Sequence, residues 1–324
     1  RRAGKITAAA RAYAGELVKP GVTTHEIDRA VEHFIRKQGA VPSFLHYNGY
    51  PASVCVSVND EIIHGIPGKR VLQSDIVSVD VGAFLDGFHG DCAATFACGQ
   101  VSDEAMHLIH VTEQGFWSIK LARSGNRVYD ISHAVQQYVE ANGCSVVRDF
   151  VGHGVGARLH EPPEVPNFGP AGHGPRLQPG MTIAVEPMVC AGDWRVKVLK
   201  ALDTVSADGS LTAHYENTIL ITDGEPEVLT RWRIEYGMRV AQIVRSLAGM
   251  QGGLFCVLDT DGPYLLLCDG KRRKLENPQT EKGGFTTRPR RLISSTLSWI
   301  SSGQAGTYPT ETYGGRWPLS ELRN

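Results

Sequence analysis

An internal repeat in the first 230 residues limits the folds that this chain can adopt. Residues 21–39 (GVTTHEIDRAVEHFIRKQG) and 125–143 (GNRVYDISHAVQQYVEANG) align without gaps at an offset of 104 residues, from Gly21 to Gly125. Each segment has apolar residues at i, i+3, i+4, i+7 and i+8, the pattern of an amphipathic helix. The matching positions are Ile27, Ala30, Val31, Phe34 and Ile35 in the first copy and Ile131, Ala134, Val135, Tyr138 and Val139 in the second. The repeat predicts two equivalent halves.

Helix-end signals support the same two helices. Thr23 and Glu26 have the spacing of a capping box at the start of the first helix. Gly39 and Gly143 stand where each helix is expected to end. The two halves therefore match in their end signals as well as in their apolar positions.

Two carboxylates fall on a predicted hairpin in the first half. The valines of residues 77–81 alternate with polar residues, which predicts a strand with Asp80 at its middle. Residues 93–97 predict the returning strand, headed by Asp91. Both acids thus lie on β-structure that otherwise has the composition of a core.

The second half repeats this arrangement. Residues 181–189 (MTIAVEPMV) and 214–222 (HYENTILIT) are rich in β-branched residues and contain Glu186 and Glu216. Glu186 follows Asp80 by 106 residues, which is close to the repeat offset. We therefore expect four carboxylates at one pseudo-symmetric centre.

Such a cluster needs a cationic partner, because buried unpaired ions are costly. The strand segments themselves contain no Lys or Arg near these acids. His153, between two glycines, is a fifth candidate ligand, and an oxygen-rich set with one nitrogen favours Mn²⁺, Fe²⁺ or Co²⁺ over a thiolate zinc site. Bridging carboxylates can hold two ions about 3.5–4 Å apart and activate a water molecule between them.

The first 230 residues resemble type I methionine aminopeptidases of the pita-bread metallopeptidase family. The runs that carry the resemblance are YNGYPASVCVSVND (47–60), IIHGIP (62–67), VDV…DGFHGD (79–91), FVGHGVG…LHEPP (150–163), PGMTIAVEPM (179–188) and HYENT (214–218). The resemblance implies an α+β fold, the duplicated pita-bread (creatinase/aminopeptidase) fold with pseudo-two-fold symmetry. It also implies two divalent metal ions, which could be Co, Mn, Fe or Zn. Asp80, Asp91, His153, Glu186 and Glu216 would be their ligands, with Asp91 and Glu216 bridging.

The same resemblance implies roles for further residues. His64 would contact the substrate near the cleaved bond, His160 would stabilise the tetrahedral intermediate, and Glu186 would shuttle the proton of the attacking water. Tyr47, Tyr50 and Cys55 would line the pocket for the methionine side chain, where aromatic rings and sulfur suit a thioether.

Three positions depart from the family pattern. Residues 198–210 stand where the family usually has an Asp-Gly-Trp segment, but they contain no Trp, and Leu202 is the nearest apolar residue. Asn217 replaces the usual His after the last Glu, and Leu159 stands where an aromatic residue is common. These departures affect the rim of the pocket, and with it the second-residue preference, but not the ligands.

Charge separates the last part of the chain from the rest. Residues 1–230 have 19 Lys and Arg against 26 Asp and Glu, whereas residues 231–324 have 14 against 8. Residues 238–279 resemble a KOW-type small β-barrel of ribosomal proteins, which implies binding to RNA through Arg245, Lys271, Arg272, Arg273 and Lys274. Residues 280–324 have the composition of a disordered tail.

The leading hypothesis is a cytoplasmic, monomeric metallo-aminopeptidase of residues 1–232 with a small RNA-binding extension. It would remove the N-terminal methionine of nascent proteins when the second residue is small, by attack of a hydroxide shared between the metal ions. Two alternatives stay open: a pita-bread peptidase of the Xaa-Pro type, and an inactive scaffold that binds RNA or the ribosome. The chain shows no signal peptide and no apolar run long enough for a membrane helix, and its seven cysteines include no CxxC pair.

Overall fold

The computed structural model describes residues 1–199 and 204–231, together with the backbone of five strands between residues 243 and 286. The chain divides into two units, Arg1–Arg231 and Trp232–Asn324. Within the described residues, no helix has the length and apolar character that a membrane span requires.

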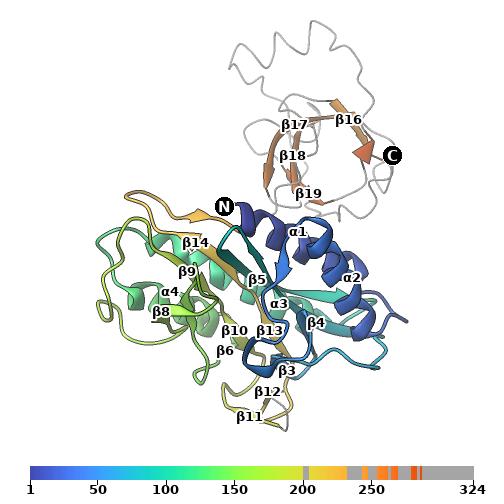
Figure 1. Cartoon of the computed structure of the whole chain (residues 1–324), viewed down its shortest axis with the longest axis horizontal. Coiled ribbons are helices and arrows are strands. Elements are labelled where there is room, and N and C mark those ends of the chain that lie inside the picture. Colours follow the sequence, from blue (N-terminus) through green and yellow to red (C-terminus); the bar gives the residue numbers. More distant parts are fainter. Residues whose placement is uncertain are drawn as a thin grey trace, which may run out of the picture. The chain divides into compact units, whose positions relative to one another are not determined.

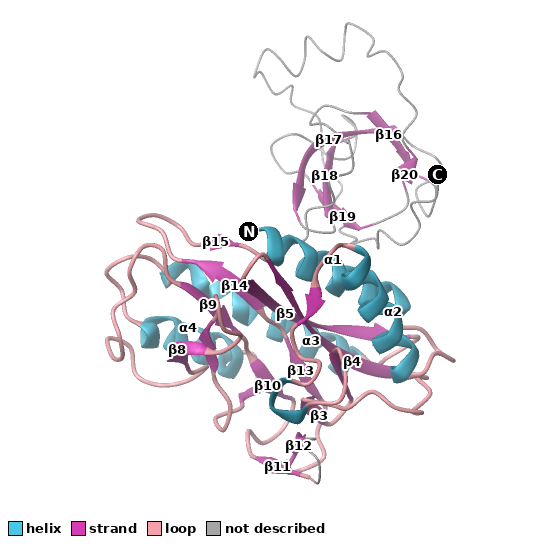
Figure 2. Ribbon diagram, viewed as in Figure 1, coloured by secondary structure: helices cyan, strands magenta, loops and turns pink. Residues whose placement is uncertain are grey.

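Two helices and five strands form the first half of unit 1 (Figure 1). They are α1 (Arg2–Leu17), α2 (Thr24–Lys37), β1 (Val41–Pro42), β2 (Val54–Val58), β3 (Glu61–Ile63), β4 (Asp75–Leu85) and β5 (Phe88–Cys98). Strand β5 pairs antiparallel with β4 along its whole length and so occupies one edge of β4. Strands β2 and β1 therefore pair with the opposite edge of β4. Figure 2 shows α1 and α2 beside these strands, and both helices bury their apolar faces against them.

The β4–β5 hairpin is longer than the sequence predicted. Its two turn residues, Asp86 and Gly87, both have positive φ angles, 52° and 83°, as in the tight turns that fit the twist of a hairpin. The returning strand begins at Phe88 rather than at residue 93. Residues 88–92 pair with β4 through their backbone, although apolar and polar side chains do not alternate along them. Asp91 is therefore inside β5 and not at its head.

Two α-helices, a 3₁₀ turn and ten strands form the described part of the second half of unit 1. The helical segments are α3 (Asp103–Phe116), a 3₁₀ turn (Trp117–Leu121) and α4 (Val128–Ala141). The strands are β6 (Ser145–Val146), β7 (Gly152–Gly154), β8 (Glu161–Val165), β9 (Thr182–Val185), β10 (Met188–Cys190), β11 (Val196–Val198), β12 (Thr204–Ser206), β13 (Thr212–His214), β14 (Asn217–Leu220) and β15 (Glu227–Val228). They form sheets in the orders β15-β14-β9-β7-β8, β13-β10-β6 and β11-β12-β3.

Helices α2 and α4 match the predicted repeat. Each has 14 residues, and α4 begins 104 residues after α2. The capping box of Thr23 and Glu26 is present at the start of α2. Ile27, Val31 and Ile35 are completely buried, as are their counterparts in α4 (Ile131, Val135 and Val139). The two helices thus pack in the same way, each against the strands of its own half.

The two acidic strands of the second half are interrupted at their glutamates, which the sequence did not predict. The first segment breaks into β9 and β10 at Glu186 and Pro187, because proline has no N–H for the strand ladder. The second breaks into β13 and β14 next to Glu216. Glu216 pairs instead with Ala93 of β5: each backbone N–H donates to the other residue's carbonyl, at 2.9 and 3.2 Å. This pair joins the two halves at their centre.

Unit 2 contains a five-stranded antiparallel sheet in the order β19-β18-β17-β16-β20. Its strands are β16 (Ile243–Ser246), β17 (Leu254–Asp261), β18 (Tyr264–Cys268), β19 (Gln279–Lys282) and β20 (Phe285–Thr286). The sheet extends to Thr286, past the predicted end of the small barrel at residue 279. Arg245 lies in β16, whereas Lys271, Arg272, Arg273 and Lys274 lie outside the described residues. Most of the predicted tail also lies outside them.

Candidate metal centre

The fold brings the four predicted carboxylates and His153 together at the centre of unit 1. Asp80 of β4 and Asp91 of β5 lie close enough for each carboxyl group to shift the pKa of the other. His153 Nε2, from β7, lies 3.8 Å from Asp91 Oδ2 and 3.6 Å from Glu186 Oε1. Asp91, His153 and Glu216 each offer one donor atom within 4.8 Å of the other two. All five side chains therefore face one common space.

The carboxylates of this centre lack partners for several of their oxygens. Asp80 Oδ1, Asp91 Oδ1 and Glu216 Oε1 are buried and accept no hydrogen bond from any residue that the structure describes. Burial raises the pKa of Asp80 to about 7, although Asp91, the Val81 amide and Arg11 lower it. Burial, followed by repulsion from neighbouring carboxylates, raises the pKa values of Asp91, Glu186 and Glu216. Buried acids with open lone pairs are what a set of cation ligands requires.

His153 is held in the tautomer that a metal ligand needs. Its Nδ1 lies 2.8 Å from the Gly154 carbonyl oxygen, which can only accept a hydrogen bond, so Nδ1 carries the proton. Burial and His160 lower the pKa of His153 to about 4. The imidazole is therefore neutral near pH 7, and the lone pair of Nε2 is directed at the carboxylates.

Sequence analysis missed a further histidine of this centre, His214. Its Nε2 lies 3.8 Å from Glu186 Oε2 and 3.8 Å from Glu216 Oε2, and it has no hydrogen-bond partner. Burial, followed by His64, lowers the pKa of His214 to about 3. The signal was present in the run HYENT, because residues two apart in extended backbone share a face.

Arg11 is a buried cation beside these acids, and sequence analysis did not identify it. Arg11 comes from α1, and its Nη1 donates to the carbonyl oxygens of Ala93 and Glu216 at 3.1 and 2.8 Å and to Asn217 Oδ1 at 3.1 Å. Arg11 occupies the buried stripe that includes Ala10 and Ala14. An arginine among the buried alanines of a helix was the available signal.

His64 and His160 lie at the edge of the centre. The ring centroid of His160 is 4.1 Å from that of His153, and its Nδ1 is 2.7 Å from the Tyr47 hydroxyl. His64 has a left-handed backbone with φ of 62°, a strained conformation that is common at functional sites. Its ring stands edge-on to that of Phe150.

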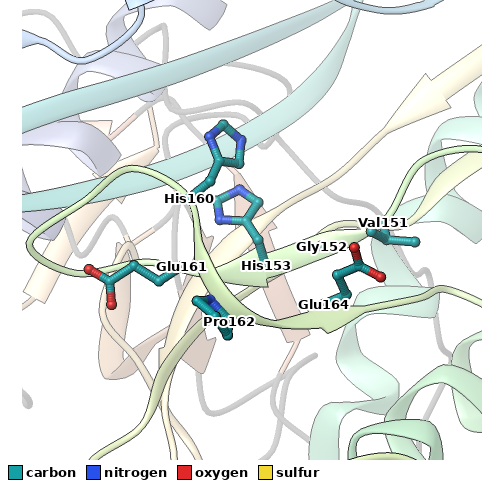
Figure 3. A pocket seen from close by; sticks show the side chains of 7 residues that line it. All are labelled: Val151, Gly152, His153, His160, Glu161, Pro162 and Glu164. Atoms are coloured by element: carbon teal, nitrogen blue, oxygen red, sulfur yellow. The ribbon is translucent and has the colours of Figure 1, made fainter.

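A pocket of about 360 Å³ lies beside His153 and His160. It is lined by Val151, Gly152, His153, His160, Glu161, Pro162 and Glu164 (Figure 3). His153 and His160 project next to each other in this view. The pocket therefore borders the centre at His153.

The three residues predicted to bind the methionine side chain lie in one apolar cluster. Tyr50 and Cys55 are buried there with Phe44, Ala52 and Leu159, and Tyr47 packs against them. The Tyr50 hydroxyl donates to the carbonyl oxygens of Val54 and Gly65 at 3.1 and 3.0 Å. These bonds satisfy the hydroxyl, so the ring presents an apolar face to the cluster. Within the run 198–210, which departs from the family pattern, residues 200–203 with Leu202 lie outside the described residues.

A comparison with protein families identifies the family to which a chain with this centre belongs. The profile of metallopeptidase family M24 matches residues 1–223. The chain belongs to metallopeptidase family M24. A metallopeptidase family implies bound metal ions, and the open carboxylate oxygens and neutral imidazoles of the centre fit divalent ones.

Individual relatives within M24 are methionine aminopeptidases. The enzyme of Clostridium perfringens is 54% identical over 233 residues, which cover 71% of this chain and 94% of that protein. Methionine aminopeptidase 1 of Bacillus subtilis is 50% identical over 234 residues, again 71% of this chain and 94% of that protein. The crystal structure of the Thermotoga maritima methionine aminopeptidase is 44% identical with a TM-score of 0.70, covering 71% of this chain and 94% of that one.

A solved structure from the Xaa-Pro class, the alternative considered from the sequence, is less similar to this chain. The Xaa-Pro dipeptidase of Bacillus anthracis is 24% identical with a TM-score of 0.58, and the match covers 72% of this chain but 59% of that one. At this identity the likeness extends to the fold alone. The predicted pita-bread fold of unit 1 is therefore confirmed.

Proposed function

We propose that this chain removes the N-terminal methionine from nascent polypeptides by hydrolysis of the first peptide bond. The observation that carries the proposal is the convergence of four carboxylates and two neutral imidazoles at the centre of a chain that is 54% identical to a methionine aminopeptidase. The predicted activity is confirmed over the Xaa-Pro and inactive-scaffold alternatives, because the relatives that match at 40–54% identity are methionine aminopeptidases.

We assign the metal-holding role to two groups that share Glu216. One contains Asp91 and His153, and the other contains Asp80; Glu186 lies beside His153. Two divalent ions held there would supply Lewis acidity for activating water and polarising the peptide carbonyl. The oxygen-rich donor set favours Mn²⁺, Fe²⁺ or Co²⁺, with Zn²⁺ as a further candidate.

The chain's own groups then orient the substrate and move its protons. Tyr47, Tyr50 and Cys55 provide the apolar surface for the methionine side chain. Glu186 accepts the proton of the attacking water and passes it to the leaving amine, while the C–N bond breaks and the hydroxyl joins the methionyl carbonyl carbon. His64 contacts the substrate near the cleaved bond, and His160 donates a hydrogen bond to the carbonyl oxygen as negative charge develops on it.

A substrate comparison tests this function. After treatment with EDTA, the protein should release methionine from Met-Ala-Ser only when Mn²⁺ or Co²⁺ is restored, and it should not cleave proline dipeptides. Glu216→Gln should lower kcat/KM by about 10²–10³, because a metal ion contributes several kcal/mol. Glu104→Gln, an exposed change on α3, should have no effect. Cleavage of the proline dipeptides in preference to Met-Ala-Ser would contradict the proposal.

We further propose that unit 2 binds RNA and brings the peptidase to ribosomes. The sheet of β16–β20 and the excess of 14 Lys and Arg over 8 Asp and Glu in residues 231–324 support this. The RNA contacts proposed are Arg245, Lys271, Arg272, Arg273 and Lys274. Full-length protein should sediment with ribosomes at low salt and dissociate at high salt, whereas residues 1–231 should remain in the supernatant. Equal sedimentation of the two proteins would refute it.

The compartment proposed is the cytoplasm, with the chain acting as a monomer. Five cysteines among the described residues, Cys55, Cys92, Cys98, Cys144 and Cys190, are buried and unpaired. Reduced thiols are typical of a reducing compartment.

A further inference from the structure

His214 has the same spatial relation to its carboxylates as the predicted ligand His153. The Nε2 atom of His214 lies 3.8 Å from one oxygen of Glu186 and 3.8 Å from one of Glu216. The Nε2 atom of His153 lies 3.6 Å from Glu186 and 3.8 Å from Asp91. Both imidazoles therefore approach two carboxylates at nearly equal distances.

These distances are too long for hydrogen bonds and suit a shared ion. An N–H···O bond spans about 2.7–3.2 Å between heavy atoms. An ion about 2.0–2.2 Å from each donor can join nitrogen and oxygen atoms up to about 4 Å apart. The 3.8 Å separations at His214 fall in the second range.

The burial of His214 strengthens this interpretation. The residue is 2% exposed, and its Nε2 has no hydrogen-bond partner. A buried polar atom without a partner needs an explanation, and an ion between the donors provides one. Asp80, His214 and Glu216 offer three donor atoms within 4.8 Å of one another, as Asp91, His153 and Glu216 do.

The backbone also fixes the position of His214. Its N–H donates to Thr95 Oγ1 at 2.8 Å, and its carbonyl accepts from the same hydroxyl at 3.0 Å. The neighbouring Glu216 is fixed by its reciprocal pair with Ala93. Both side chains thus start from backbone that β5 holds in place.

We propose that His214 is an imidazole ligand of the second metal ion, alongside Asp80 and Glu216. The inference rests on the proposed function, and it gives each of the two ions one histidine. His153 serves the ion near Asp91, and His214 serves the ion near Asp80.

The test is metal titration of His214→Ala and His214→Gln. Calorimetry with Mn²⁺ should show two sites in the unchanged protein. In both variants one site should keep its affinity, and the dissociation constant of the other should rise by about 100-fold, since even outer partners of a metal are worth about 10- to 100-fold. His160→Ala, which removes an imidazole outside both groups, should keep both sites.

A count of imidazole nitrogens provides the second measurement. Pulsed EPR of the Mn²⁺-loaded protein should detect two coordinated histidine nitrogens, and only one in His214→Gln. Glutamine keeps a buried polar group of similar size, so this variant decides the question even where His214→Ala does not fold. Recovery of both affinities by glutamine, or an unchanged nitrogen signal, would reduce His214 to a hydrogen-bond donor and overturn the proposal.

Failure of the inference can be told from failure of the proposed function. If the unchanged protein releases methionine in a metal-dependent way and His214→Ala still binds two ions normally, only the inference fails. If the unchanged protein neither binds Mn²⁺ nor releases methionine, the proposed function itself fails.

Discussion

At the scale of single residues, burial shifts the pKa values of the two kinds of group in the metal centre in opposite directions. Burial raises the pKa of Asp80 to about 7, whereas it lowers the pKa of His153 to about 4 and that of His214 to about 3. In the metal-free protein the acids therefore tend to hold protons and the imidazoles tend to release them. Divalent ions take the place of those protons.

This chemistry predicts how the stability of the metal-free protein depends on pH. The two kinds of group have opposite effects, and the effect of the imidazoles fades as the pH rises past about 6.5, because the unfolded imidazoles lose their protons there while the folded ones are already neutral. Asp80 then loses its proton only in the folded state, because its unfolded counterpart has already lost it. The Tm in EDTA should fall as pH rises from about 6.5 to about 8.5, and saturating Mn²⁺ should abolish the fall.

Two carboxamide variants check the origin of that fall. Asp80→Asn has no proton to lose, so its Tm in EDTA should fall less steeply with pH. Asp223→Asn, an exposed change, should leave the slope unaltered. A slope that is the same in all three proteins would contradict the assignment to the buried acids.

His160 gives a prediction that separates catalysis from metal binding. His160→Ala should lower kcat by about 10²–10³, the typical effect of removing a donor to a developing oxyanion. Its metal content should stay the same, because His160 belongs to neither donor group. Tyr47→Phe removes the 2.7 Å contact to His160 Nδ1 and should cost roughly tenfold. Metal loss in His160→Ala, measured by elemental analysis, would disprove this separation.

At the scale of elements, close contact between α1 and β5 places Arg11 behind the centre. Gly15 permits this contact, because a Cβ atom there would stand 2.3 Å from Phe96 Cε1. Gly15→Ala should destabilise the protein by about 1–3 kcal/mol through overpacking. Helix propensity alone predicts a gain of about 1 kcal/mol, so urea unfolding distinguishes the two effects by sign.

A second change at the same contact provides the control. Phe96→Val removes the ring that the new methyl group would meet, so Gly15→Ala should be less harmful in that background than alone. If the two changes are simply additive, the steric explanation is incorrect.

At the scale of the whole molecule, the centre belongs entirely to unit 1 and is made by both of its halves. Asp80 and Asp91 come from the first half, and Glu186 and Glu216 come from the second. Residues 1–231 should therefore keep the kcat/KM of the full chain toward Met-Ala-Ser, as measured by methionine release. Loss of activity in residues 1–231, with its far-UV spectrum unchanged, would show that unit 2 contributes to the reaction.

The sequence by itself determined much of unit 1. Apolar periodicity predicted α2 and α4 at matching positions, because a buried helix face repeats every three to four residues. The order of acids and His153 along the chain was sufficient to indicate a metal centre. These features are local, so each can be recognised within a segment of the chain.

Only the tertiary structure decided which further groups enter the centre. Arg11 precedes Glu216 by 205 residues, yet its guanidinium donates to the Glu216 carbonyl. His214 becomes a candidate ligand because β5 holds its backbone at Thr95 and that of Glu216 at Ala93, and the donor atoms of both side chains lie within 4.8 Å of one of Asp80. Local patterns mark Arg11 and His214 as unusual, but they do not show which distant segments these side chains meet, because such contacts depend on how the two halves pack.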